Sequence, residues 1–287
     1  MNGIPTFLKW AGGKSQLIEQ YKPFFPKKIE RYFEPFLGSG AVFFFIKKTF
    51  NPKEVFLSDI NEESIITFKV VRDKVEELIR NLKKRKKLHS KEYFYKVRKE
   101  KPQELSGVER ASRLIYLNKT CYNGLYRVNA KGEFNVPFGE YKNPSIFDEK
   151  VLREASKLLK DINIEVAFFE RILDKAKRGD FIYFDPPYFP ISKTSSFTSY
   201  QKDVFLEKEQ RKLAEVFKEL DKRGCLLMLS NSDHPLIRKL YDGFNIHKIK
   251  ARRSISCIGT NRRKINELLI INYKNKNLNS FVKQVNL

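Results

Sequence analysis

The chain is poor in cysteine and lacks long apolar runs, and each shortage excludes a class of protein. Its 287 residues contain three cysteines, Cys121, Cys225 and Cys257, which lie far apart and form no CxxC pair. This spacing argues against a disulfide framework and a zinc site and fits reduced thiols in an intracellular protein. Because no apolar stretch of about 18 residues and no signal peptide occur, we expect a cytoplasmic protein with no membrane partner.

Acidic residues are also scarce relative to basic ones. Lys and Arg number 57 against 34 Asp and Glu, which gives a formal net charge of +23. A protein this basic usually binds a polyanion, so we expect nucleic acid as the partner, although a lysine-rich proteome would supply part of the excess. Hydrophobic residues at 41% and aromatic residues at 14% indicate a folded globule.

The most informative segment is a predicted strand that ends in two prolines. The apolar run 181–184 precedes Asp185-Pro186-Pro187-Tyr188. Proline lacks the N–H that a sheet needs, so the pair ends the strand in a rigid turn at the edge where open α/β sheets bind ligands. Asp185 Oδ and the Pro186 carbonyl offer two acceptors for the hydrogens of an exocyclic amino group, and Tyr188 can stack on its ring. An ordinary turn after a buried strand is the alternative.

The remaining patterns predict alternating strands and helices at both ends of the chain and a helical, charged middle. A short strand runs into a glycine turn over 31–40. The other expected elements are strands at 55–61, 225–229 and 267–273, helices at 41–48, 107–119, 149–160 and 206–223, a helical stretch from 62 to 82, and a hairpin at 122–144 with its turn at 129–132. We therefore predict an α/β fold with a doubly wound, mostly parallel sheet, interrupted by a helical insert over 62–146.

A second candidate site lies at the glycine turn. Gly38 and Gly40 stand where a strand meets a helix, so the backbone can approach a ligand there, but the third glycine of a dinucleotide fingerprint falls at Phe43. Asp59, at the end of the next strand, can accept hydrogen bonds from ribose hydroxyls. A glycine turn with a ribose acid and without the full pyrophosphate motif fits S-adenosylmethionine better than NAD.

Other segments leave two interpretations open. The segment 7–15 is not a P-loop, because the position five residues before Gly13 is Leu8. Trp10 and Lys14 could cover a cofactor and meet its carboxylate, or Trp10, the only tryptophan, could pack in the core. The basic segments 83–87 and 252–264 could contact phosphates or form solvated surface.

Together and in this order, the motifs resemble those of the Dam-type DNA adenine-N6 methyltransferases, from about Phe7 to Tyr273. Residues 7–14 (FLKWAGGK), 34–40 (EPFxGxG) and 59–61 (DIN) match the cofactor motifs of that family. Residues 122–127 (YNGLxR) and 132–142 (GEFNVPFGxYK) match its DNA-reading hairpin, and residues 252–256 (RRSIS) match its C-terminal segment. Several motifs in order are far more specific than any one of them.

The resemblance implies a Rossmann-like methyltransferase fold, with residues 1–61 and 147–287 as catalytic domain and 62–146 as DNA-recognition domain. S-adenosyl-L-methionine would be bound by Trp10, Lys14, Glu34, Phe36, Gly38, Gly40, Asp59 and Asp185. The duplex would contain GATC, and its base edges would meet Lys9, Leu125, Arg127 and Pro137. Tyr122 and Asn123 would fill the gap left by a flipped adenine, Tyr141 would lie against the DNA, and the backbone contacts would come from Arg98, Asn129, Ser192, Arg252 and Arg253.

The expected reaction is direct methyl transfer to N6 of an adenine flipped out of the duplex, with no metal and no covalent enzyme intermediate. The catalytic segment would be Asp185, Pro186, Pro187 and Tyr188. Cytosine N4, RNA adenine and a protein amide remain alternative acceptors, because each is an amino group that fits the same oxygens. We expect a monomer; a cognate restriction endonuclease encoded nearby is one partner that it could serve, and the sequence does not distinguish this setting from a solitary regulator.

Overall fold

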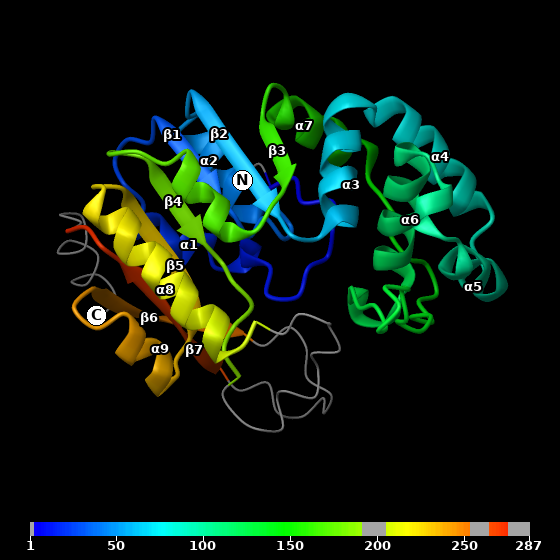
Figure 1. Cartoon of the computed structure of the whole chain (residues 1–287). Helices are drawn as coiled ribbons and strands as arrows, with labels where there is room; N and C mark the ends of the chain where they lie inside the picture. Colours follow the sequence, from blue (N-terminus) through cyan, green and yellow to red (C-terminus); the bar gives the residue numbers. More distant parts are fainter. Residues whose placement is uncertain (1–2, 191–204, 253–263, 275–287) are drawn as a thin grey trace, which may run out of the picture.

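Short apolar runs form the strands of one seven-stranded sheet in the computed structural model, which describes residues 3–190, 205–252 and 264–274 (Figure 1). The strands are β1 (Arg31–Glu34), β2 (Glu54–Asp59), β3 (Asn163–Val166), β4 (Phe181–Phe184), β5 (Leu226–Ser232), β6 (Asn245–Arg252) and β7 (Lys264–Ile271). Their order is β3-β2-β1-β4-β5-β7-β6. Strand β7 is antiparallel to both of its neighbours, and the other recorded pairs are parallel. The predicted doubly wound, mostly parallel sheet is confirmed.

The strand order reverses between β1 and β4, which lie side by side with Phe33 opposite Ile182. In doubly wound sheets a crevice opens at this switch point, outside the carboxyl ends of the strands. Strand β1 ends there at Glu34, and β4 ends immediately before Asp185. The topology therefore brings the first cofactor motif and the Asp-Pro-Pro-Tyr segment to the same edge, although 150 residues separate the two acids in the sequence.

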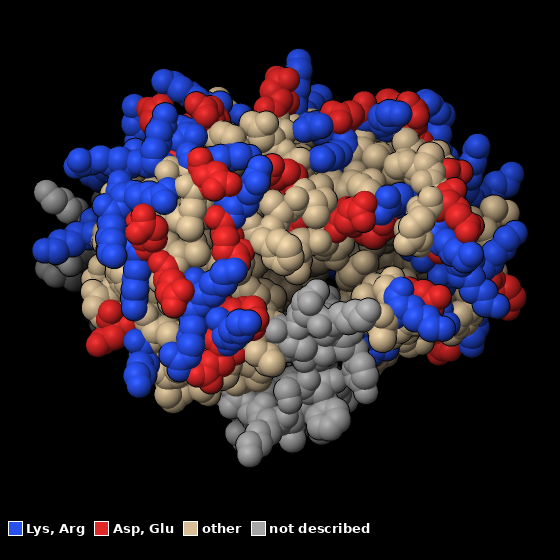
Figure 2. Space-filling view, viewed as in Figure 1, with Lys and Arg blue, Asp and Glu red and all other residues tan. Residues whose placement is uncertain are grey.

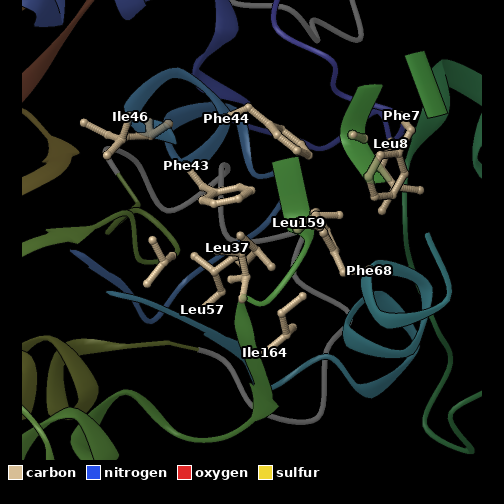
Figure 3. Packing of buried hydrophobic residues seen from close by; sticks show 14 of the residues in the cluster. Phe7, Leu8, Leu37, Phe43, Phe44, Ile46, Leu57, Phe68, Leu159 and Ile164 are labelled. Carbon is tan, nitrogen blue, oxygen red and sulfur yellow. The ribbon is translucent and has the colours of Figure 1, made fainter. Parts of the chain in front are cut away.

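Strand β4 shows why its four residues are apolar without interruption. Phe181 and Tyr183 belong to the hydrophobic cluster on one face of the sheet, and Ile182 and Phe184 belong to the cluster on the other. A central parallel strand is covered on both faces, so every side chain is buried. The first face carries α1 (Ile18–Tyr21), α2 (Ala41–Thr49) and α7 (Glu149–Leu159), and Figure 3 shows part of its core; the second carries α8 (Glu207–Lys222) and α9 (Pro235–Leu240).

The middle of the chain forms a helical part beside β3, to the right in Figure 1. It contains α3 (Glu62–Asp73), α4 (Val75–Lys87), α5 (Lys91–Lys99) and α6 (Gly107–Thr120). Helices α3, α4 and α6 contribute to the same hydrophobic cluster as α2 and α7, whereas α5, the end of α6 and residues 134–146 form a cluster of their own. The hydrophobic core is thus continuous across residue 61, so packing does not separate a domain at that residue. The assignment of residues 62–146 to DNA recognition stays a prediction.

The following details differ from the sequence predictions. Strands β3 and β6 were not expected, since β3 is only four residues long and β6 carries charged and polar side chains, as edge strands often do. The helical stretch from 62 to 82 divides at Lys74, whose backbone is not helical. The predicted hairpin at 122–144 has no regular strands, and residues 121–144 form only the isolated bridges Val128–Phe134 and Cys121–Phe138.

Short 3-10 helices complete the described chain: η1 (Lys14–Gln16), η2 (Lys22–Phe24), η3 (Pro102–Glu104), η4 (Tyr122–Gly124) and η5 (Phe169–Asp174). Within the described ranges, no helix has the length and apolar character needed to cross a membrane.

Candidate active site and nucleic-acid interface

The Asp185 carboxylate is held from two directions. The ammonium of Lys14 lies 2.8 Å from Asp185 Oδ1, and the Ser230 hydroxyl donates a 2.7 Å hydrogen bond to the same oxygen. Ser230 stands on β5 and shares a 2.9 Å hydrogen bond with the Tyr183 hydroxyl on β4. The Lys14 side chain is only 3% exposed and that of Asp185 is 20% exposed, so this pair is largely shielded from water. The carboxylate is consequently fixed in position at the edge of the sheet.

The Tyr188 side chain is held in place through both its hydroxyl group and its ring. Its hydroxyl donates a 2.7 Å hydrogen bond to Glu267 Oε2 on β7. The Lys14 ammonium lies 4.8 Å from the centroid of its ring, within the range of a cation–π interaction. Because β7 runs antiparallel to β5, Glu267 lies opposite Ser232 at the carboxyl end of β5 and can reach this site.

The turn between β4 and the following segment is tied down by side chains of β5 and α8. Gln210 Nε2 donates to the Pro187 carbonyl at 2.9 Å, and Asn231 Nδ2 donates to Gln210 Oε1 at 2.9 Å. The Asn231 Oδ1 oxygen in turn accepts the Phe189 N–H at 3.2 Å. Both Gln210 and Asn231 are fully buried. The predicted catalytic turn is therefore a rigid feature of the protein and not a free loop.

The glycine turn after β1 brings three predicted cofactor residues together. Gly38 has φ +49°, and its N–H donates to Asp59 Oδ2 at 3.0 Å. A Cβ atom at Gly38 would lie 3.0 Å from Cδ1 of Trp10, so the tryptophan edge rests directly on the backbone of this turn. Gly40 (φ +70°) is the N-cap of α2. Trp10 is partly buried against the core, so it packs there and covers the turn at the same time.

Two predicted cofactor residues, Glu34 and Phe36, make their contacts with neighbouring side chains and not with the glycine turn. The Glu34 side chain is 2% exposed, and its carboxylate accepts a 2.7 Å hydrogen bond from the Tyr32 hydroxyl. The Phe36 ring stacks on Phe169 at 5.5 Å, in the cluster on the α8 face of the sheet. The Glu34 and Phe36 side chains thus pack against neighbouring residues beside the site and are not exposed in it.

Burial raises the pKa of three carboxyl groups at this edge. For Glu34 the pKa lies well above its usual value because of burial, which the Tyr32 hydroxyl partly opposes. For Asp59 burial raises the pKa, and the N–H groups of Asn61 and Gly38 oppose the shift. For Glu267 burial raises the pKa, against the Lys14 ammonium and the Tyr188 hydroxyl. Clusters of shifted acids at a cleft are typical of functional sites.

Exposed apolar side chains lie beside Asp59. Ile60, Val166 and Phe168 are 51%, 48% and 70% exposed at the ends of β2 and β3, and the Ala167 N–H donates to the Asp59 carbonyl at 3.2 Å. Val166 and Phe168 line a surface pocket together with Lys212 of α8. A flat apolar ligand next to a carboxylate would suit this surface.

The predicted DNA-reading loop is joined to the N-terminal segment. The Asn118 side chain accepts the Lys9 N–H at 2.7 Å and donates to the Lys9 carbonyl at 2.8 Å. The Lys9 ammonium lies 5.2 Å from the ring centroid of Tyr141. The Tyr122 side chain is 52% exposed, and its N–H donates to the Pro137 carbonyl at 2.9 Å. Lys9, Tyr122, Pro137 and Tyr141 are thereby gathered in one region.

Other predicted DNA residues are held within the loop or on α5. Arg127 Nε donates to Asn135 Oδ1 at 2.7 Å. The Asn129 side chain closes the turn, since its Oδ1 accepts the N–H groups of Lys131 and Glu133. Arg98 Nη1 donates to the Val136 carbonyl at 3.2 Å. Asn123 adopts a left-handed conformation (φ +56°), and Leu125 packs against the cluster beneath the loop.

Three predicted contacts cannot be placed. Ser192 and Arg253 lie outside the described residues, and of Arg252 only the backbone, at the end of β6, is described. Figure 2 shows Lys and Arg over both the sheet part and the helical part of the visible face, with acidic residues among them. Such a distribution attracts phosphates without selecting a sequence, so base contacts would have to supply selectivity. No group of three or more His, Cys, Asp or Glu suited to a metal occurs among the described side chains.

Comparison with known proteins decides the family. The family model of D12 class N6 adenine-specific DNA methyltransferases matches residues 10–255. The chain belongs to this family. It is 47% identical to the Type II methyltransferase M.MjaIII of Methanocaldococcus jannaschii, over 94% of this chain and 99% of that protein, and 42% identical to the Type II methyltransferase M1.LlaDCHI of Lactococcus lactis subsp. cremoris, over 95% and 96%. It is 37% identical to the DNA adenine methylase of Escherichia coli K12, over 93% and 94%.

The D12 methyltransferase therefore transfers a methyl group to adenine N6 in DNA, with S-adenosyl-L-methionine as the donor. The residues present fit this cofactor. The two glycines let the backbone turn sharply at the end of β1 in a left-handed conformation, Asp59 supplies a carboxylate that accepts the Gly38 N–H, and an exposed apolar surface adjoins this carboxylate. The predicted enzyme class, methyl donor and DNA substrate are confirmed.

Sequence reasoning missed several groups that the D12 methyltransferase places in the site. Ser230, Asn231 and Glu267 contact the Asp185 turn, and Gln210 reaches it from α8. One signal was present for part of the set, because the polar run 230–232 directly follows the buried apolar residues of β5. For Gln210 and Glu267 nothing in the local sequence indicates the contact.

Proposed function

We propose that this methyltransferase modifies adenine N6 within duplex GATC, and that residues 62–146 act as its recognition domain. The observation that carries this proposal is the Arg127–Asn135 hydrogen bond, which presents an arginine at the loop that also holds the exposed Tyr122. A bidentate arginine–guanine contact discriminates between bases by about 1–3 kcal/mol. Lys9, Leu125 and Pro137 would complete the contacts to base edges.

The target adenine would leave the duplex, with Tyr122 and Asn123 filling the gap in the stack. Extrusion costs a few kcal/mol and exposes the amino group. The Tyr122 side chain is exposed and its backbone is fixed to Pro137, which supports a role at the surface of the duplex. Tyr141 would lie against the DNA, while Arg98, Asn129, Ser192, Arg252 and Arg253 would contact its backbone.

The flipped base would be received by the Asp185 turn. Lys14 and Ser230 both contact Oδ1 of Asp185, so we assign one N6–H to Oδ2 and the other to the Pro186 carbonyl. Two acceptors favour a pyramidal nitrogen whose lone pair is free for attack. Tyr188 would stack on the ring, in the orientation that Glu267 gives it. The carboxylate and the ring both stabilise positive charge as it develops on N6, and the proton can leave after methyl transfer.

S-adenosyl-L-methionine, when bound, supplies the electrophilic methyl group. We assign its ribose hydroxyls to Asp59 and its adenine to the apolar surface of Ile60 and Phe168, because these groups adjoin one another at the ends of β2 and β3. Trp10 and Gly38 would line the same side. Lys14 would face the carboxylate of the cofactor, while Glu34, Phe36 and Gly40 would shape the walls.

The decisive experiment measures transfer of tritiated methyl groups to two duplexes, one with a single GATC and one with that site changed to GTAC. Label in the first duplex alone, recovered as N6-methyladenine, would support the proposal. Equal labelling of both would contradict GATC specificity while leaving the adenine methyltransferase intact. Single-stranded RNA and a cytosine-only duplex serve as controls for the other amino acceptors.

We infer that the catalytic unit is a monomer, and light scattering with and without the duplex would test this oligomeric state. We also infer that it acts in the cytoplasm. The names of the relatives support two biological settings, because two are Type II methyltransferases and one is a DNA adenine methylase. We propose a cognate restriction endonuclease as a partner, since the two relatives with the higher identities carry the Type II name. Resistance of methylated DNA to an endonuclease encoded beside this chain would test it.

A further inference from the structure

Two aromatic rings join the cofactor side of the molecule to the DNA-reading loop. Trp10 and Tyr126 are stacked, with ring centroids 5.6 Å apart and an interplanar angle of 18°. Trp10 belongs to the N-terminal segment, whereas Tyr126 directly precedes Arg127 in the loop. Tyr126 also packs against two hydrophobic clusters, the one beneath the sheet and the one beneath the loop. It therefore stands at the junction of the two parts.

On the cofactor side, Trp10 is in close contact with the glycine turn. A Cβ atom at Gly38 would lie 3.0 Å from Cδ1 and 3.3 Å from Nε1 of the indole, so the ring has little room to move toward the turn. The N–H of Gly38 is bonded to Asp59, the acid assigned to the ribose. A change in the position of the indole would therefore shift Gly38 and the Asp59 carboxylate, to which the cofactor is assigned.

On the DNA side, Tyr126 is fixed to both limbs of the loop. Its ring meets Phe134 of the opposite limb edge-on, at 6.0 Å between centroids. The next residue in each limb forms the Arg127–Asn135 pair, in which Arg127 Nε donates to Asn135 Oδ1 at 2.7 Å and the Asn135 N–H donates to the Arg127 carbonyl at 3.0 Å. Movement of the Tyr126 ring would thus shift the base-reading arginine.

The Tyr126 hydroxyl remains neutral in this position. Burial raises its pKa to about 12, with a further contribution from the Glu63 carboxylate and an opposing one from a hydrogen bond with the Asn61 side chain. Asn61 lies two residues after Asp59, and its N–H donates to Asp59 Oδ1 at 3.0 Å. The Tyr126 side chain thus lies near the segment that carries Asp59, and its ring makes the direct contact with Trp10.

We propose that Tyr126 is a positioning residue that couples the two binding sites, so that a filled cofactor site and a bound duplex each strengthen binding at the other. This inference rests on the proposed assignment of the cofactor site and of the reading loop. The reciprocity is required by linkage, since a factor gained by one ligand is gained equally by the other. A contiguous chain of packed groups, Asp59–Gly38–Trp10–Tyr126–Arg127, supplies the physical connection.

The test compares the affinity for S-adenosylhomocysteine, by isothermal titration calorimetry, with and without saturating GATC duplex. In the wild-type protein we expect the duplex to tighten cofactor-site binding about tenfold, within the usual range of coupling between sites. Tyr126→Leu should bring this ratio close to one, and Tyr126→Phe, which keeps the stacked ring, should retain most of it. A wild-type ratio in Tyr126→Leu would overturn the proposal.

A matched control separates coupling from general loosening of the loop. Tyr93, on α5, is also a half-buried tyrosine packed against the cluster beneath the loop, but its ring meets Tyr116. Tyr93→Leu should preserve the wild-type ratio. Equal loss of the ratio in Tyr93→Leu and Tyr126→Leu would show that the packing of the whole cluster, and not the stack, carries the effect, and would overturn the role given to Tyr126.

Trp10 provides a second readout because it is the only tryptophan in the chain. Duplex binding alone should change its fluorescence in the wild type and leave it unchanged in Tyr126→Leu. Methylation of the same duplex by the wild-type protein is measured in parallel. Absence of methylation would contradict the proposed function, whereas methylation without any coupling of the two ligands would overturn only the role of Tyr126.

Discussion

The edge of the sheet and the loop of residues 121–144 are held together by different means. At the edge, the groups around Asp185 stand on β4, β5 and β7 and are fixed by buried partners such as Lys14 and Ser230. In the loop, two isolated bridges and a few side-chain hydrogen bonds, such as Arg127–Asn135, maintain the shape. Transfer chemistry needs atoms held to within a fraction of an ångström, whereas reading DNA tolerates adjustment on binding.

The contrast teaches that loss of a group should have different consequences in the two regions. A side chain removed at the edge leaves a buried partner without its hydrogen bond, which costs stability as well as rate. A side chain removed from the exposed loop leaves the rest of the fold in place and changes which duplex is bound. The following variants would sharpen or contradict this division.

The largest effect is expected for Asp185→Ala. Loss of the carboxylate removes both an acceptor for N6–H and the negative charge that faces the developing cation, so kcat should fall by at least about 10²–10³-fold. Single-turnover methylation measures the rate, and fluorescence anisotropy of a labelled GATC duplex measures binding, which should be retained. Equal loss of binding and rate would show that the carboxylate supports DNA binding, contrary to the role assigned here.

A smaller effect, chiefly on specificity, is expected for Arg127→Ala. Discrimination between GATC and a duplex with its guanine replaced should fall by about 1–3 kcal/mol, because the arginine no longer reads the base edge. Ratios of kcat/KM for the two duplexes give this difference. Lys131→Ala, an exposed change in the turn of the same loop, is the matched control and should keep the wild-type ratio.

For Glu267→Gln we expect a loss of about fivefold to tenfold in kcat, since a hydrogen bond to a charged group is weakened and Tyr188 is less firmly oriented. Tyr188→Phe removes the same bond from the other side. A double-mutant cycle on kcat tests the pairing, because the double variant should lose no more than either single one. Additive losses would show that Glu267 acts independently of Tyr188.

The smallest effect concerns stability and pH at Glu34. Burial raises the pKa of this carboxyl in the folded protein, so the folded state retains a proton that the unfolded chain releases, and stability falls as pH rises through the folded pKa. Glu34→Gln removes this dependence and keeps an oxygen for the Tyr32 hydroxyl. Between about pH 5 and pH 8, the melting temperature of the variant should therefore decline less than that of the wild type. Glu215→Gln, an exposed change on α8, should follow the wild type.

The sequence predicted the elements whose pattern is local. The run 181–184, the glycine turn at Gly38 and the amphipathic helices α6, α7 and α8 all occur within a few residues of the expected bounds. It failed for β3 and β6, where a four-residue strand and a charged edge strand carry no clear alternation. The turn of the loop does lie at the predicted residues 129–132, but the sequence did not show that the Asn129 side chain closes it.

By itself, the sequence determined the methyltransferase family, the doubly wound sheet and the position of the Asp185 turn, because each depends on short motifs and their order along the chain. Only the tertiary structure decided which groups meet at the site. Glu267 bonds to Tyr188 across 79 residues, and Trp10 stacks on Tyr126 from another part of the chain. Such contacts follow from strand order, from the antiparallel direction of β7 and from packing of the helical part, and no local pattern of residues encodes them.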